Sequence, residues 1–159
     1  MSIKIHSDNV KDQIGCCGIW CGSCVAGNGV LRELTKRYEK IITSYDLEQW
    51  APKDFDFKEF ANGLKSIQKM PVCPGCLKGG GRDNCEIRVC ALSKNFEDCS
   101  ECDRPEDCEN IELLETMQQG AKNAGLMVRT ENTGRNELLK KWTKQLKNTW
   151  PSSILFQDE

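Results

Sequence analysis

Hydrophobic positions between residues 30 and 69 recur at helical spacing in two runs. Steps of three and four residues in the first run predict one amphipathic helix from about Val30 to Gln49, ended by Pro52. Its apolar positions are Leu31, Leu34, Tyr38, Ile41, Ile42 and Tyr45. Asp56 and Glu59 have the spacing of a capping box and begin a second, shorter run of Phe57, Phe60, Ala61, Leu64 and Ile67. The two runs together predict a helical hairpin over residues 30–69.

Two further helices are predicted in the C-terminal part of the chain. Ile111, Leu114, Met117 and Ala121 share one face of a helix that Gly125 can close as a C-cap. After a short extended piece at residues 126–130, Thr133 can cap a last helix, which Pro151 stops. Its apolar positions are Leu138, Leu139, Trp142, Leu146 and Trp150. The pattern therefore predicts a mainly α fold, a small helical domain with cysteine-rich metal-binding loops and little strand.

The same pattern suggests how the chain is divided. We expect residues 1–125 to form a cysteine-rich metal-binding domain in which the hairpin at 30–69 is an insert. Residues 126–159 then form an extended segment and an amphipathic helix that packs on this domain. The chain has 159 residues, of which 38% are hydrophobic and 29% charged, as is usual for a globular protein. Its net charge of −2 gives no strong signal for a nucleic-acid partner.

Cysteine is the unusual feature of the composition. There are 11 cysteines but a single histidine, His6. The start of the chain has no apolar run suited to a signal peptide, and no segment approaches the roughly 20 apolar residues of a membrane span. These observations predict a cytoplasmic protein without a membrane partner. In that compartment, and with an odd cysteine count, thiolates or metal sites are favoured over disulfides.

Seven of the cysteines lie between residues 73 and 108. Cys73-Pro-Gly-Cys76 and Cys99-Ser-Glu-Cys102 have the spacing of zinc knuckles, in which a two-residue turn directs both sulfurs at one ion. Pro74 presets its own φ, and Gly75 can supply a positive φ for the bend. Cys85, Cys90 and Cys108 offer further ligands, so this block predicts a metal site.

The remaining cysteines, Cys16, Cys17, Cys21 and Cys24, form an N-terminal block. The C-x3-C-x2-C spacing of the last three also occurs in radical S-adenosylmethionine enzymes. Those enzymes need a large barrel after the motif, whereas here helices follow and only 135 residues remain after Cys24. Three thiolates leave one coordination position, which Cys16, a cysteine of the second block, His6, water or a substrate could fill. Spacing alone does not separate zinc from an iron–sulfur cluster.

The order and spacing of these motifs resemble a known family. Cys17-Gly-Ile-x-Cys21-x-x-Cys24, Cys73-x-Gly-Cys76, Cys85-x-Ile-Arg-x-Cys90, Cys99-x-x-Cys102 and Cys108 are similar to the cysteine-rich prokaryotic family catalogued as domain of unknown function 3795. The resemblance extends from about Gly15 to Ile111 and implies a small cytoplasmic zinc-binding domain without an established activity. Arg82 and Asp107 stand where the family often has cysteine and proline, and Cys16 is extra, so the number of metal ions stays open.

The function that we predict is therefore thiolate metal binding, with structural zinc, one or two ions, as the first choice of cofactor. A chain with one histidine and no phosphate-binding loop does not favour a standard hydrolase or nucleotide enzyme. We expect an interaction module whose partner is another protein. One alternative is an iron–sulfur or open-site metal protein with redox or enzymatic activity at Cys17, Cys21 and Cys24. Another is a thiol sensor or metal-trafficking protein. The oligomeric state is left open.

Overall fold

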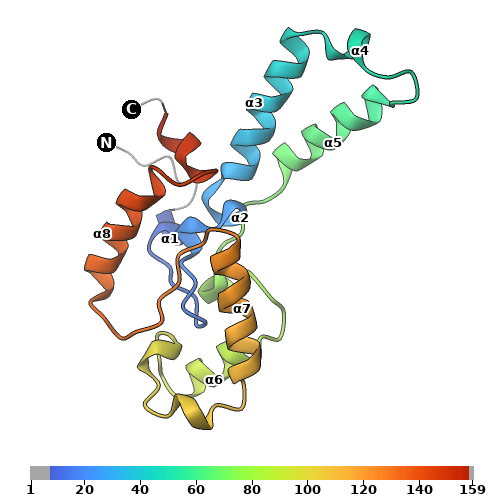
Figure 1. Ribbon diagram of the computed structural model, residues 1–159. Helices are drawn as coiled ribbons and strands as arrows, with labels where there is room; N and C mark the ends of the chain where they lie inside the picture. The colour runs from blue at the N-terminus through green and yellow to red at the C-terminus, as the bar shows by residue number, and fades with distance from the viewer. Residues whose placement is uncertain (1–7, 158–159) are drawn as a thin grey trace.

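The computed structural model describes residues 8–157, which form helices joined by loops (Figure 1). The α-helices are α1 (Asp8–Lys11), α2 (Val25–Asn28), α3 (Val30–Ser44), α4 (Leu47–Trp50), α5 (Phe57–Lys69), α6 (Glu86–Ser93), α7 (Ile111–Asn123) and α8 (Arg135–Leu146). Short 3-10 helices are η1 (Cys21–Ser23), η2 (Cys76–Lys78), η3 (Cys99–Glu101), η4 (Pro105–Asp107) and η5 (Ser152–Phe156). Two isolated bridges, Ile14 with Trp20 and Ile19 with Val128, are present, and the described residues form no sheet. The predicted mainly α fold is confirmed.

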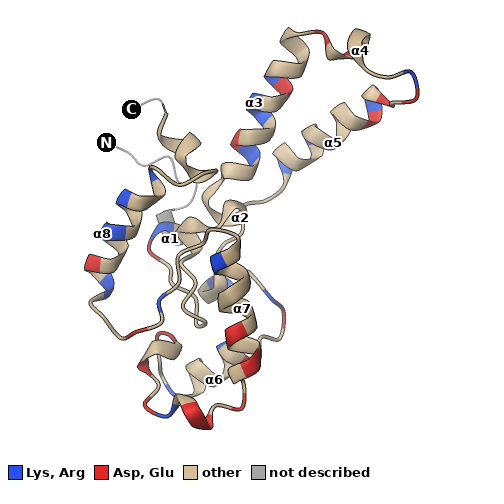
Figure 2. Ribbon diagram, viewed as in Figure 1, with Lys and Arg blue, Asp and Glu red and all other residues tan. Residues whose placement is uncertain are grey.

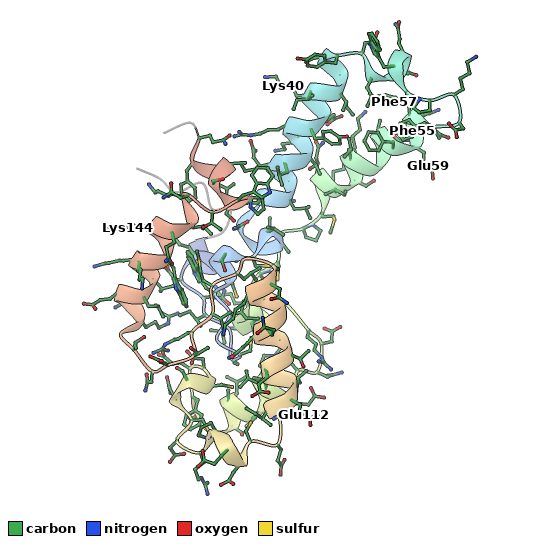
Figure 3. The ribbon with its side chains drawn as sticks, in the orientation of Figure 1. Lys40, Phe55, Phe57, Glu59, Glu112 and Lys144 are labelled. Atoms are coloured by element: carbon green, nitrogen blue, oxygen red, sulfur yellow. The ribbon has the colours of Figure 1, made fainter. Side chains whose placement is uncertain are left out.

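Helices α3 and α5 form the predicted hairpin, which projects from the rest of the molecule (Figure 1). The Asp56 carboxylate accepts a hydrogen bond from the Glu59 amide at 2.8 Å, which confirms the predicted N-cap of α5. The rings of Tyr38 and Phe60 pack edge to face across the two helices, with centroids 6.1 Å apart. Phe55 and Phe57 lie toward the far end of the hairpin (Figure 3).

The first helix of the hairpin is shorter than predicted. Instead of running from Val30 to Gln49, it ends at Ser44, and a separate turn of helix, α4, follows. The Ser44 hydroxyl donates to the Lys40 carbonyl, and Asp46 adopts a left-handed conformation with φ 53°. Serine and aspartate compete with the helix for backbone hydrogen bonds, and aspartate tolerates this conformation, so the chain turns here although the apolar spacing continues.

The main hydrophobic core lies where the N-terminal segment meets α3, α8 and η5. Trp20 is fully buried and stacks on Trp142, with ring centroids 5.8 Å apart. The buried members of this core are Ile14, Trp20, Val30, Trp142, Leu146, Ile154, Leu155 and Phe156. The sequence analysis did not predict η5, which contributes three of these residues.

The last helix differs from the prediction at both ends. It begins after Gly134, whose carbonyl accepts from the Leu138 amide, and no side chain caps it, so the predicted Thr133 cap is not formed. It ends at Leu146, well before Pro151. Trp150 therefore leaves the apolar face and is 68% exposed, while the chain turns back and buries the apolar side chains of η5.

Gly125 closes helix α7 as the predicted C-cap, two residues after the helix ends at Asn123. The chain then returns to the N-terminal segment. Leu126 donates to the Ala121 carbonyl and Gly125, at φ 79°, donates to Lys122, which is a Schellman motif. Residues 127–129 then pair with residues 18–20 through bonds from Trp20 to Met127 and from Arg129 to Gly18. Gly18 has φ 88°, and a Cβ there would overlap the Arg129 carbonyl oxygen, so only glycine permits this approach.

The charges of the described residues are unevenly placed. Lys and Arg positions recur along α8, which carries Lys144, and acidic positions gather near the start of α7, where Glu112 lies (Figures 2 and 3). Just after α8, the Lys147 ammonium lies 5.4 Å from the centre of the Phe156 ring. None of the described helices combines the length and apolar character needed to cross a membrane.

Candidate metal centre

Two cysteine pairs far apart in the sequence lie on tight turns. Cys21 and Cys24 bound η1, where the Cys24 amide donates to the Cys21 carbonyl at 3.1 Å. Cys73 and Cys76 flank a turn in which Gly75 has φ 92°, as predicted. The buried Gln13 side chain holds this second turn by donating to the Pro74 carbonyl at 3.0 Å and accepting from the Leu77 amide at 3.2 Å. We call Cys21, Cys24, Cys73 and Cys76 the knuckle set.

Backbone contacts join the two turns of the knuckle set. The Cys73 amide donates to the Ala26 carbonyl at 3.0 Å. The Cys76 amide donates to the sulfur of Cys21, and burial, reinforced by the neighbouring Cys76, Cys24 and Cys73, raises the pKa of Cys21. Arg88 of α6 fixes the loop from the other side by donating to the carbonyls of Cys76 and Gly80, each at 3.0 Å. The fold therefore brings together cysteines that the sequence places in separate blocks.

A second group of cysteines lines a pocket between α6, η3 and the start of α7. This pocket set consists of Cys90, Cys99, Cys102 and Cys108, and the cavity has a volume of about 1010 Å³. Cys99 and Cys102 bound η3, and the Asp98 carboxylate caps this turn by accepting from the Ser100 amide at 2.8 Å. Cys108 follows η4, where its amide donates to the Pro105 carbonyl.

The other three cysteines, Cys16, Cys17 and Cys85, lie between the two sets. They are 1%, 8% and 6% exposed and belong to a small apolar cluster with Ile87 and Ala91. The Cys16 thiol is hydrogen-bonded to Cys76, while the Cys16 carbonyl accepts from the Cys99 amide at 2.8 Å. This buried trio is therefore the layer through which the knuckle set and the pocket set are connected.

Burial, together with neighbouring cysteines, raises the pKa of several thiols. Burial, reinforced by neighbouring cysteine charges, raises the pKa of Cys16 to about 12, and burial also raises the pKa of Cys17 to about 11. Burial and the nearby Cys108 charge raise the pKa of Cys99 to about 12. Thiolates packed in this way repel one another, and a bound cation is the usual means of stabilising them. All 11 cysteines are free thiols in this structure.

The described cysteines come near one another in the fold, but their side chains do not form a complete metal coordination sphere. Within residues 8–157, no three cysteine, histidine, aspartate or glutamate side chains have the spacing of a metal site. His6, which could complete a site, lies outside the described residues. The assignment of the 11 cysteines as metal ligands therefore stays a prediction.

A buried ion pair that the sequence analysis missed supports the pocket set. Arg129 Nη1 lies 2.6 Å from Asp98 Oδ2, and the two side chains are 4% and 1% exposed. Asp98 precedes Cys99, and the Arg129 amide also donates to Gly18, next to Cys17. No local sequence signal identifies this pair, because its members are 31 residues apart along the chain.

Comparison with known families agrees with the cysteine pattern. Residues 13–113 match a family model described as "Protein of unknown function (DUF3795)". This range agrees with the stretch from about Gly15 to Ile111 that carries the resemblance, contains every cysteine, and leaves α8 and η5 outside. Neither the curated proteins nor the solved structures provide a significant match.

Proposed function

The chain belongs to the DUF3795 family, and we propose that it is a thiolate metal-binding protein in which zinc, one or two ions per chain, holds the cysteine-bearing segments together. The observation that carries the proposal is the knuckle set. Two C-x2-C turns separated by residues 25–72 meet in space, joined by hydrogen bonds from Cys73 to Ala26 and from Cys76 to the Cys21 sulfur. Two such turns are the usual source of four thiolates for structural zinc.

The chemistry of the donors fits a soft cation. Zinc binds thiolates at about 2.3 Å, which requires the four sulfurs to rotate inward from their present positions. The four side chains are only half-buried, so this rotation does not disturb a packed core. Each thiol that binds loses its proton and becomes a thiolate ligand, and the ion then neutralises charges that otherwise raise the neighbouring pKa values.

A structural role for the metal explains why the cysteine-bearing loop needs to bury little apolar surface. From residue 73 to residue 84, only Gly75 is buried, and Leu77 is 47% exposed. A segment of this kind gains too little hydrophobic energy to offset its lost conformational entropy. Metal ligation supplies that missing stability in small zinc domains.

Metal content is the direct test. Protein purified without air is expected to be colourless and to contain one or two zinc ions per chain by elemental analysis. Cys73→Ser should lose at least one ion because it removes a ligand of the knuckle set. The matched control Lys78→Ser changes an exposed side chain of the same loop and should keep the full content. A chain that retains no metal of any kind would refute the proposal.

A second candidate is an iron–sulfur or open-site redox protein centred on Cys17, Cys21 and Cys24. Two observations favour it. The Ile19 amide donates to the Cys17 sulfur, an arrangement that stabilises a thiolate ligand, and the charge of Cys76 acts on both Cys17 and Cys21. Cys76 would then be the fourth cysteine. A brown sample with iron and sulfide would select this candidate over zinc.

The proposed setting is the reducing environment of the cytoplasm, where cysteines are retained as thiols or metal ligands. The 11 unpaired thiols of the structure support it. In this setting the metal-stabilised chain would act as a binding module for another protein, with no catalytic residue of its own. Thiol counting in the metal-loaded protein would separate this role from a thiol sensor, which needs reactive cysteines left over after metal binding.

A further inference from the structure

We infer that the pocket set, Cys90, Cys99, Cys102 and Cys108, forms a second metal site that is separate from the knuckle set and exchanges its ion through the adjoining pocket. The inference rests on the proposed function, since it divides the thiolates of that function between two sites. The ligand expected is a thiophilic ion such as zinc, held by four sulfurs.

Convergence is the first argument. The four cysteines come from α6, both ends of the η3 turn and the residue after η4, yet all four line one cavity. The Cys99–Cys102 turn is fixed by the Asp98 cap and by the buried ion pair of Asp98 with Arg129. The backbone that carries both cysteines is therefore held in place at the wall of the cavity.

Separation from the knuckle set is the second argument. The buried trio, with Ile87 and Ala91, forms an apolar cluster between the two sets. Side chains that are at most 8% exposed within such a cluster cannot move to a metal without opening it. We therefore assign four ligands to each site and leave Cys16, Cys17 and Cys85 as packing residues.

Access is the third argument. The pocket set lies on the wall of a cavity of about 1010 Å³, large enough for a small-molecule ligand. Its rim carries both acidic side chains, such as Asp103 and Asp107, and basic ones, such as Lys94 and Arg104. Because the four cysteines line this cavity, a chelator can approach an ion at this site without unfolding the chain. Exchange at the pocket set should be fast compared with unfolding.

Paired substitutions test the division of ligands. The full chain, loaded with zinc and freed of excess, is expected to hold two ions. Cys102→Ser/Cys108→Ser should hold one, Cys21→Ser/Cys24→Ser should hold one, and the combined variant none. Two ions in Cys102→Ser/Cys108→Ser would overturn the inference. So would a single ion in the unaltered chain, which leaves the proposed function intact, whereas no ion in the unaltered chain refutes both.

A measurement on the unaltered chain does not depend on whether variants fold. A chromophoric chelator is added until half of the zinc has been released, the protein is alkylated, and the labelled cysteines are identified by mass spectrometry. We expect the label on Cys90, Cys99, Cys102 and Cys108, with the knuckle set protected. Label spread equally over both sets, or confined to the knuckle set, would contradict the inference while zinc binding itself stands.

Discussion

The Arg129–Asp98 ion pair is a buried contact that lies beside both cysteine blocks. Asp98 accepts from the Ser100 amide within the Cys99–Cys102 turn, and Arg129 lies on the segment that pairs with Gly18 beside Cys17. Nη2 of the same guanidinium donates to Asn132 and Thr133. One buried arginine thus connects the segment that precedes α8 to residues beside both cysteine blocks.

Replacing Arg129 should be costly because it leaves a buried carboxylate without its counter-charge. We expect Arg129→Met to lower the free energy of unfolding by about 3 to 5 kcal/mol, measured by denaturant titration. The double variant Arg129→Met/Asp98→Asn should recover part of the loss, because an amide removes the charge and still accepts from Ser100. The control Arg82→Met changes an exposed arginine and should stay within about 0.5 kcal/mol of the unaltered chain. Equal stability of Arg129→Met and the control would contradict this role.

Residues whose effect is local were predictable from the sequence, and those that act across the fold were not. The positive φ of Gly75, the Asp56 cap and the Gly125 C-cap follow from steric and hydrogen-bonding properties of single residue types. The Asp98–Arg129 pair and the clamp of Gln13 on Pro74 depend on tertiary contacts. Buried polar pairs of this kind have no periodic signature.

At the scale of elements, the amphipathic pattern identified the main helices but not all of their ends. The run that predicts a helix over Val30–Gln49 is interrupted at Asp46, because local side-chain hydrogen bonds compete with the helix. Beyond the end of α8, Trp150 continues the helical spacing yet is exposed, since burying Ile154, Leu155 and Phe156 requires the chain to turn after Leu146. The meeting of the two C-x2-C turns was likewise beyond the pattern, because residues 25–72 separate them and local spacing carries no information on tertiary contacts.

The capping of α5 gives a test at this scale. Asp56→Ala removes the acceptor for the Glu59 amide, so we expect α5 to lose about 1 kcal/mol of stability. Amide hydrogen exchange of the first turns of α5 should accelerate about fivefold, the factor that corresponds to about 1 kcal/mol. Asp54→Ala makes the same change of charge at an exposed loop position and should leave exchange in α5 unaltered. If the two variants accelerate α5 exchange equally, the effect is one of charge and the cap contributes nothing.

At the scale of the whole molecule, the described residues contain two hydrophobic clusters of different character. The first joins Trp20 and Trp142 with α3 and η5, and is built of large apolar side chains. The second contains Cys16, Cys17 and Cys85 with only Ile87 and Ala91 as other fully buried members. The first can be stable through burial alone, because its side chains remove much apolar surface from water. The second is small and lies between the two proposed metal sites.

This difference predicts that metal removal unfolds one part of the molecule and spares the other. After chelation, amides of α6 and of residues 73–108 should exchange at rates close to those of an unfolded chain, because without ions the thiol-rich cluster cannot hold the loops. Amides of α3 and α8 should keep their protection, since the stacked Trp20–Trp142 pair still packs against them. Hydrogen exchange followed by mass spectrometry on metal-loaded and chelated protein measures both parts in one experiment. Unchanged protection of α6 after verified metal loss would show that the ions are not structural. Uniform loss over the chain would show instead that the two clusters fold as a single cooperative unit.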